Sequence, residues 1–188
     1  MIILGIDPGL NSTGYGIIRA ESGRCSLEAA GAIRPSARQP LPQRLHQLHA
    51  GLSRIIDTHR PELAVIEALF VHHQYLTTAA LMAHARGVAC LVSAQFSVPL
   101  VEYLPTRIKK ALTGHGSASK EQVAKAVDLW IGGGIDSRWP SDTTDALALA
   151  IAHAHISRVP SEAQAVPRLR SRRLAPSLRA LLLNRRSS

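Results

Sequence analysis

The sequence predicts an α/β fold in which a mixed five-stranded sheet is flanked by helices. Short apolar runs of strand length alternate with longer runs whose apolar residues recur at helical spacing. The first three predicted strands follow one another without a helix, whereas the fourth comes after a helical crossover and should lie parallel to the first. A chain of 188 residues, with 46% apolar and 19% charged residues, is large enough for one sizeable core.

The first predicted strand ends in an acid. Residues 1–6 form an almost wholly apolar run, typical of a strand buried on both faces, and Asp7 follows directly. Pro8-Gly9 then turns the chain, and residues 13–19 and 24–33 continue an antiparallel meander. A carboxylate at the end of a buried strand is costly unless charges or hydrogen bonds compensate it. Taken alone, Asp7 is equally well explained as a residue that merely opens the turn.

A second acid ends the fourth predicted strand. Leucines and isoleucines at helical spacing predict an amphipathic helix that begins at Leu41 and ends before Arg60-Pro61. Residues 63–67 are then apolar until the last of them, Glu67. Because this strand should run parallel to the first, Asp7 and Glu67 are expected at the same edge of the sheet.

The remaining elements complete the pattern. We expect a strand over residues 98–103. We also expect four helices, over residues 75–95, 105–112, about 119–130 and 142–156. The helix over 75–95 is rich in alanine, so it lies either in the centre of the core or on a self-association surface. Ser117 or Ser119 is expected to cap the helix that runs to Trp130, and Ser141 the last helix.

Two further acids begin the last predicted helix. Asp142 and Asp145 are three residues apart, so both project from one face, and the apolar remainder of the helix must pack on the sheet. Together with Asp7 and Glu67 they would repel one another unless cations bridged them, and oxygen-only ligands suit Mg²⁺ or Mn²⁺. Such a site performs two-metal phosphoryl transfer, with the ions about 4 Å apart. Alternatively, Asp142 and Asp145 are only a charge pair at a helix N-terminus.

The formal net charge of +9 is unevenly distributed. Residues 156–188 hold eight arginines and one acid, a charge of +7, which leaves about +2 for the rest. We therefore divide the chain into a folded domain, residues 1–157, and a basic, mobile tail, residues 158–188. The tail is interpreted as a polyanion-binding arm or as a solubilising segment. The sequence shows neither a signal-type segment nor a membrane span, and its two cysteines are isolated, so a cytoplasmic location is expected.

Several motifs resemble, in order along the chain, those of bacterial RuvC-type Holliday junction resolvases. These motifs are Ile6-Asp7-Pro8-Gly9 with Thr13-Gly14-Tyr15-Gly16, Ile66-Glu67 with Phe70, Ala85-Arg86-Gly87-Val88, and Asp142-Thr143-Thr144-Asp145-Ala146-Leu147-Ala148. The match runs from Met1 to about His155. It implies an RNase H-like fold and a homodimeric, divalent-metal-dependent endonuclease that nicks four-way DNA junctions symmetrically in recombination and repair. It also implies cooperation with a junction branch-migration motor.

The resemblance implies roles for individual residues. The four acids correspond to the catalytic, metal-binding carboxylates, which are Asp7, Glu67, Asp142 and Asp145. Phe70 is similar to an aromatic residue that stacks near the junction crossover, although an ordinary core Phe is the alternative. Lys109 and Lys120 match basic positions near the DNA, and Arg107 and Lys110 would add phosphate contacts. Each of these cations alone would more often be a solvated surface charge.

Two departures from the family pattern and two rival functions remain. His72 and His73 stand where other polar residues are expected, which puts the cleavage-sequence preference in doubt, and the loop before Lys120 is not identical to that of the family. His153 and His155 are two apart on a helix and make a poor metal pair. The rival functions are a ribonuclease of the same fold class that cuts RNA–DNA hybrids and a basic DNA-binding protein without catalysis.

Overall fold

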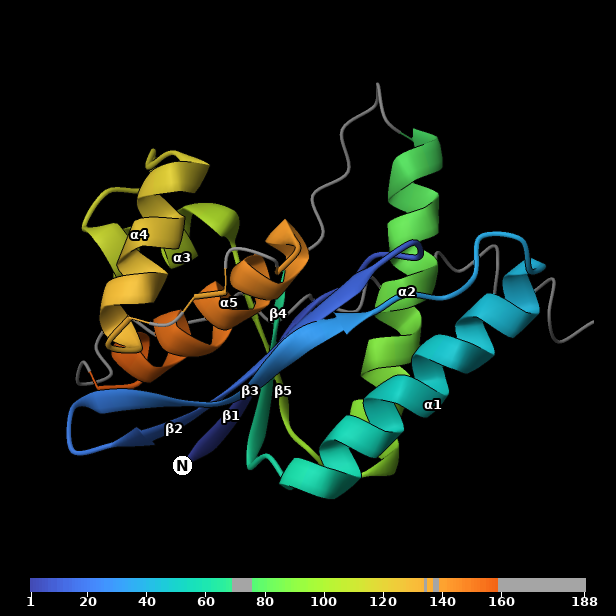
Figure 1. The fold of residues 1–188 in the computed structure, drawn as a ribbon, viewed down its shortest axis with the longest axis horizontal. Helices are drawn as coiled ribbons and strands as arrows, with labels where there is room; N and C mark the ends of the chain where they lie inside the picture. Colours follow the sequence, from blue (N-terminus) through green and yellow to red (C-terminus); the bar gives the residue numbers. More distant parts are fainter. Residues whose placement is uncertain (69–75, 134, 137–138, 159–188) are drawn as a thin grey trace, which may run out of the picture.

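The computed structural model describes residues 1–68, 76–133, 135–136 and 139–158 (Figure 1). In chain order the elements are β1 (Ile2–Asp7), β2 (Thr13–Glu21), β3 (Arg24–Ile33), α1 (Leu41–His59), β4 (Leu63–Glu67), α2 (Leu76–Gln95), β5 (Leu100–Tyr103), α3 (Pro105–Thr113), α4 (Lys120–Trp130) and α5 (Ser141–Ile156). No helix in the described part of the chain combines the length and apolar character needed to cross a membrane.

The five strands form one mixed sheet in the order β3-β2-β1-β4-β5. The first three strands are an antiparallel meander, and β4 and β5 pair in parallel on the other side of β1. Ile6 of β1 lies opposite Ile66 of β4, so the next residues, Asp7 and Glu67, leave the same edge of the sheet side by side. The predicted fold class and the predicted parallel pairing are therefore confirmed.

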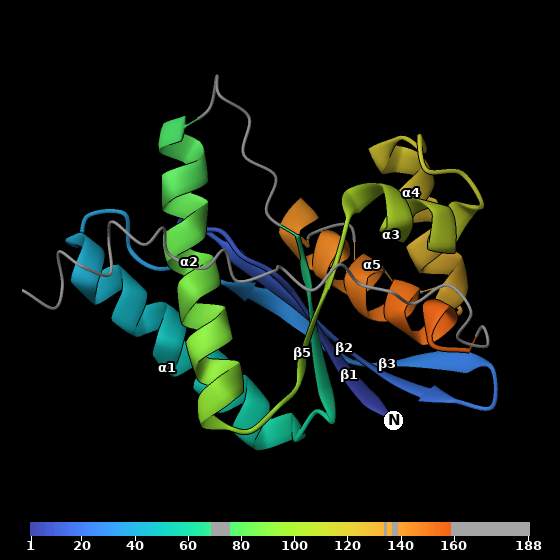
Figure 2. The ribbon, with the colours of Figure 1, turned by 180° about the vertical axis from the view of Figure 1, so that it is seen from behind.

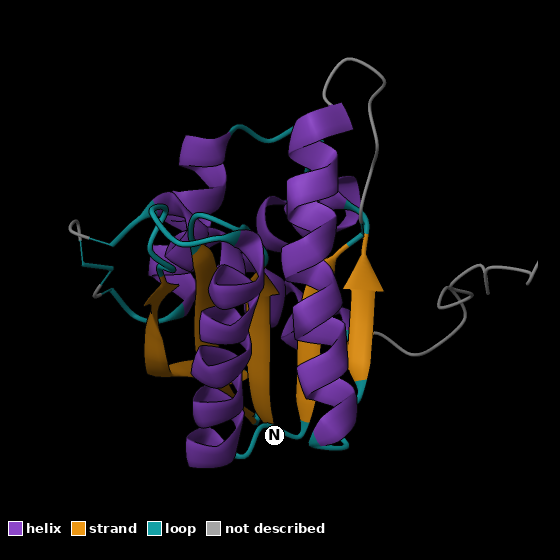
Figure 3. Ribbon diagram, turned by 90° about the vertical axis from the view of Figure 1, so that its right-hand side faces the viewer, coloured by secondary structure: helices purple, strands orange, loops and turns teal. Residues whose placement is uncertain are grey.

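The helices cover the sheet in two layers. Figures 1 and 2 show α1 and α2 on one face and α3, α4 and α5 on the other, and Figure 3 views the sheet from the side of α1 and α2. Strand β1 supplies both cores, because Ile3 packs in the cluster that contains α5, while Leu4 and Ile6 pack in the cluster that contains α1 and α2. This two-sided burial explains the continuous apolar run of β1.

Helix α5 lies unusually close to the strands beneath it. A Cβ atom at Gly5 of β1 would collide with the backbone carbonyl of Ala146, and one at Gly14 of β2 would collide with the carbonyl of Asp142. Only glycine leaves room for helix and strand backbones to meet in this way. The first two turns of α5 are consequently fixed beside the sheet edge that carries Asp7.

Some element boundaries differ from those predicted. Ser119 does cap α4, with a reciprocal bond from its backbone N–H to the Gln122 side chain. The prediction that Ser141 caps α5 is wrong: Pro140 holds the N-cap position in an extended conformation, and Ser141 is already helical. Strand β5 starts two residues later than expected, because the Val98 N–H still bonds to a carbonyl of the preceding helix end, that of Ser93.

The contact between α5 and the sheet can be tested with Gly5→Ala. The added methyl group must push α5 away from β1, so the free energy of unfolding should fall by at least about 2 kcal/mol, as in other overpacked cores. Chemical denaturation measures this loss. Gly87→Ala is the matched control: a Cβ there meets nothing within 4 Å, and alanine should stabilise α2 by about 0.5–1 kcal/mol. A Gly5→Ala variant as stable as the natural chain would contradict the close packing.

Candidate active site

Two of the predicted acids occupy neighbouring strand ends. Asp7 is the last residue of β1 and Glu67 the last residue of β4. Both are half-buried, because the strands that carry them run through the core and emerge only at this edge. Beyond Asp7 the turn is tied back on itself, since the Thr13 hydroxyl donates to the Gly9 carbonyl over 2.7 Å. The strand-end positions predicted from the apolar runs are thus confirmed.

The other two acids reach this edge from α5. Asp142 lies in the first turn of the helix and Asp145 one turn further on. Asp145 lines a cavity of about 180 Å³ together with Asp7 and Glu67. The charge of Asp142 is near enough to raise the pKa of both Asp7 and Asp145. The structure therefore brings three of the four predicted carboxylates to one cavity and the fourth, Asp142, near it.

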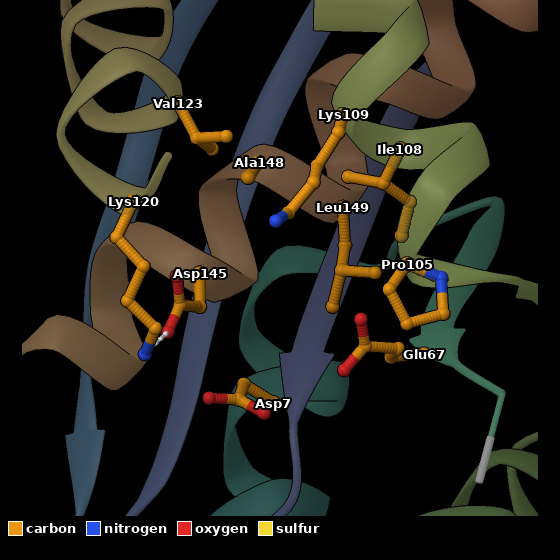
Figure 4. Close-up of a pocket in the computed structure, with 10 residues that line it drawn as sticks. All are labelled: Asp7, Glu67, Pro105, Ile108, Lys109, Lys120, Val123, Asp145, Ala148 and Leu149. Atoms are coloured by element: carbon orange, nitrogen blue, oxygen red, sulfur yellow. Dashed lines mark ion pairs between the residues drawn. The ribbon is translucent and has the colours of Figure 1, made fainter. Parts of the chain in front are cut away.

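Two lysines enter the same cavity from the α3–α4 side (Figure 4). Lys109 of α3 and Lys120 at the start of α4 both line it, and Lys120 Nζ forms an ion pair with Asp145 Oδ2 over 3.8 Å. Apolar side chains of Ile108, Val123 and Leu149 complete the wall. The cavity thus combines carboxylates at its base with cations at its rim, an arrangement suited to holding a phosphate beside bound cations.

The electrostatics of the site disfavour ionised carboxylates. Burial, followed by the charges of Asp145, Asp142 and Glu67, raises the pKa of Asp7 from 3.8 to about 7, while Lys120 opposes this shift. Burial and Asp145 raise the pKa of Glu67. Burial also raises the pKa of Asp145, against the effect of Lys120. Positive charge is needed if all of these groups are to be ionised together at neutral pH.

The residues present fit a divalent cation by their donor chemistry. Asp7, Glu67 and Asp145 offer only carboxylate oxygens, the ligands that Mg²⁺ and Mn²⁺ prefer, and a cation would relieve the repulsion that raises their pKa values. As they stand, no three His, Cys, Asp or Glu side chains within the described residues are arranged to hold a metal ion. Carboxylates that repel one another are expected to stay apart until a cation neutralises their negative charge.

Two of the predicted DNA-contacting residues line this cavity, and two more lie on α3. Lys109 and Lys120 line it, Lys110 is exposed on α3, and Arg107 lies over the ring of Tyr103 at 5.1 Å from the centroid. Phe70 lies outside the described residues. So do His72, His73 and the arginine tail beyond residue 158. Contacts of these three lysines and of Arg107 with DNA remain a prediction.

Sequence reasoning missed several side chains that support the site. Arg86 of α2 donates to the backbone carbonyl of Glu67, and Arg44 of α1 donates to the Leu10 carbonyl over 3.0 Å, just beyond Asp7. No role was predicted for His153, which bonds to the Tyr103 hydroxyl over 2.9 Å. Two signals pointed to Arg86: it lies in the Ala85-Arg86-Gly87-Val88 motif of the family resemblance, and it is a lone arginine inside the alanine-rich α2, where a charge needs a partner.

The fold and the site together define a class of protein. A mixed sheet with acids at the ends of two central parallel strands, and a helix with two more acids crossing beside them, is the arrangement of an RNase H-like nuclease. The basic rim is consistent with a nucleic-acid substrate, since phosphates are bound by Lys and Arg. The comparisons with known proteins narrow this class further.

The sequence model of the family described as crossover junction endodeoxyribonuclease RuvC matches residues 3–153. The enzyme of that name from Rhodopirellula baltica is 43% identical over 159 residues, which are 84% of this chain and 88% of the relative. The structure of Thermus thermophilus RuvC in complex with a Holliday junction substrate covers 84% of this chain and 95% of its own, with a TM-score of 0.78 and 31% identity. The chain therefore belongs to the RuvC family of crossover junction endodeoxyribonucleases.

The raised pKa of Asp7 predicts a stability that depends on pH. Between pH 4 and 7 the folded chain holds a proton on Asp7 that the unfolded chain releases, so stability falls as the pH rises through this window and the full cost is present above it. In the presence of a chelator, Asp7→Asn should therefore stabilise the protein at pH 8 by about 2 kcal/mol, roughly half the unscreened value. The gain should vanish below pH 4.

Thermal unfolding of both proteins at pH 4 and pH 8 measures this difference. Asp57→Asn serves as the control, because Asp57 is exposed on α1 and pairs only at the surface with Arg60. It should give no gain that grows with pH. An Asp7→Asn variant with equal effects at both pH values would show that Asp7 carries no such penalty.

Proposed function

We propose that this protein resolves four-way DNA junctions by paired nicks. The observation that carries the proposal is the convergence of Asp7, Glu67 and Asp145 with Lys109 and Lys120 on one cavity, in a chain of the RuvC family. A related protein, that of Thermus thermophilus, has been solved with a Holliday junction substrate. Hydrolysis should leave a 5′-phosphate and a 3′-hydroxyl, the end chemistry that the family resemblance implies.

Four carboxylates would hold the metal, namely Asp7, Glu67, Asp142 and Asp145. Two Mg²⁺ or Mn²⁺ ions, when bound, supply Lewis-acid stabilisation of the charge that develops on the scissile phosphate. Lys109 and Lys120 stand at the rim of the cavity, where they would neutralise phosphate oxygens.

The basic residues of α3 would bind the DNA backbone around the nick. Arg107 and Lys110 lie on the same helix as Lys109, which lines the cavity. Phe70, which follows Glu67 closely in the sequence, would stack on an unpaired base at the crossover, worth about 1–3 kcal/mol. Residues 158–188, which we expect to form a basic tail, would add salt-dependent contacts to phosphates.

A homodimer would place two active sites on symmetry-related strands of the junction. Helix α2 is the candidate interface, because the side opposite its buried residues is exposed and small or apolar: Ala80, Ala83, Gly87, Leu91 and Ala94. Leu91 is 53% exposed and stands in a row with these small residues, so it would add apolar area to such an interface. Cooperation with a branch-migration motor is a further expectation from the family, and a cytoplasmic location is an expectation from the sequence.

The catalytic assignment is tested by nicking assays on a four-way junction, a linear duplex and an RNA–DNA hybrid, each with Mg²⁺, Mn²⁺ or chelator. We expect paired nicks confined to the junction and dependent on metal. Asp7→Asn should slow cutting about 1,000-fold, since several kcal/mol of transition-state stabilisation depend on a properly held ion. Junction binding should be retained.

The same assay separates the alternatives. Cutting of the hybrid alone would indicate a ribonuclease, and tight junction binding without cleavage under any metal would indicate a binding protein. Asp57→Asn, which removes an exposed carboxylate far from the cavity in sequence, should cut at the normal rate. Normal cutting by Asp7→Asn would disprove the role of the strand-end acid.

The dimer surface is tested by Leu91→Glu. A carboxylate placed in an apolar interface loses its hydration, so the dissociation constant of the dimer should rise at least about tenfold. Sedimentation velocity measures the change. Leu129→Glu is the matched control, because Leu129 of α4 is 81% exposed and belongs to a different face. An unchanged dimer with Leu91→Glu, or a monomeric natural chain, would reject this interface.

A further inference from the structure

Arg86 is a nearly buried cation that the proposed chemistry does not use. Its side chain is 13% exposed and projects from α2, a helix otherwise made mostly of small and apolar residues. One guanidinium nitrogen, Nη1, donates to the backbone carbonyl of Glu67. The other, Nη2, pairs with Glu102 Oε1 over 2.6 Å. A cation held in this way needs both partners to repay its desolvation.

These contacts hold the end of β4 against α2. The next residue, Ala68, donates its N–H to the Tyr103 carbonyl over 2.8 Å, which ties the same strand end to β5. The Glu67 carbonyl and the Ala68 N–H belong to one peptide group, which α2 holds by its oxygen and β5 by its nitrogen. Because the peptide that follows its Cα atom is held through both of its polar groups, the side chain of Glu67 has a defined starting point from which it reaches the cavity.

We propose that Arg86 is a positioning residue that sets the carboxylate of Glu67 for metal binding by holding the Glu67 carbonyl. The inference rests on the proposed function, because it takes Glu67 as a metal-binding acid. Arginine is needed for geometric reasons: its two terminal nitrogens serve a carbonyl and a carboxylate at once, whereas a lysine offers a single charged centre. Residues that orient metal ligands typically matter about 10–100-fold for metal affinity or activity.

Helix α1 holds the other strand end in a similar way. Arg44 Nη2 donates to the Leu10 carbonyl over 3.0 Å and to Asn11 Oδ1 over 2.6 Å, in the turn that follows Asp7. At or just beyond each of the two strand-end acids, an arginine from the α1–α2 layer therefore binds a backbone carbonyl. This repetition favours a positioning role for Arg86 over a chance surface contact.

The test compares Arg86→Met with Arg86→Lys and with Glu102→Gln, which removes the ion pair but keeps the carbonyl bond. Three quantities are measured: Mn²⁺ affinity by calorimetry, the single-turnover cutting rate at saturating protein, and junction affinity. For Arg86→Met we expect metal affinity and cutting rate to fall about tenfold, with junction affinity within about twofold. Glu102→Gln should lose no more than about threefold, and Arg86→Lys should lie between. Arg54→Met, an exposed arginine on α1, is the control.

Combination with Glu67→Gln separates positioning from general stability. Once Glu67 no longer binds the metal, Arg86→Met should weaken Mn²⁺ affinity no further, because the two residues act as one unit. An equal additional loss in that background, or natural metal affinity and cutting in Arg86→Met alone, would overturn the inference. If Arg86→Met does not fold, Arg86→Lys in the same cycle decides. Normal cutting by Glu67→Gln would instead reject the proposed role of Glu67 itself.

Discussion

The backbone contact between α5 and the sheet is the constraint on which the rest of the structure depends. Gly5 and Gly14 leave no side chain between the strands and the first two turns of the helix, so the carbonyls of Ala146 and Asp142 lie directly on β1 and β2. A helix seated at this depth cannot slide along the sheet without collision. The register of α5 therefore fixes where its acids lie relative to the strand ends.

This close packing creates an electrostatic cost that the folded chain must sustain. Bringing α5 so near the edge partly desolvates Asp7 and exposes it to the charges of Asp145 and Asp142, which together raise its pKa to about 7. Lys120 offsets part of the repulsion through Asp145. A fold selected only for stability would replace such acids with apolar residues, so their retention at one cavity favours a functional explanation.

The sequence pattern predicted much of this arrangement because its signals are local. Apolar runs that stop at Asp7 and Glu67 predicted both strand ends, and a helical crossover between them predicted their parallel pairing. The supporting contacts could not be predicted in the same way. Arg86 reaches Glu67 across 19 residues and Tyr103 reaches His153 across 50, so only the folded chain reveals them.

The predicted starts of α5 and β5 were wrong for a different reason. Ser141 is of a residue type that often caps helices, yet Pro140 holds the N-cap position of α5. The fixed φ of Pro140, −64°, already suits the residue before a helix. At β5 the chain leaves α2 through a left-handed residue, Ser97, and the carbonyl of Ser93 in the helix still binds Val98, the residue that was expected to start the strand. Local competition between caps and turns decided both cases, and composition does not resolve it.

The two helix layers contribute different groups to the site. The α5 layer brings side-chain acids to the sheet edge, whereas α1 and α2 bind the backbone just beyond Asp7 and at Glu67 through Arg44 and Arg86. Helix α2 thus has an inner side that contacts the active-site strand and an outer side that is exposed and apolar. If that outer side joins two protomers, the same rigid helix connects the partner surface to Glu67. The spacing of two active sites would then be set by packed helices and strands rather than by loops, which suits symmetric cutting of one junction.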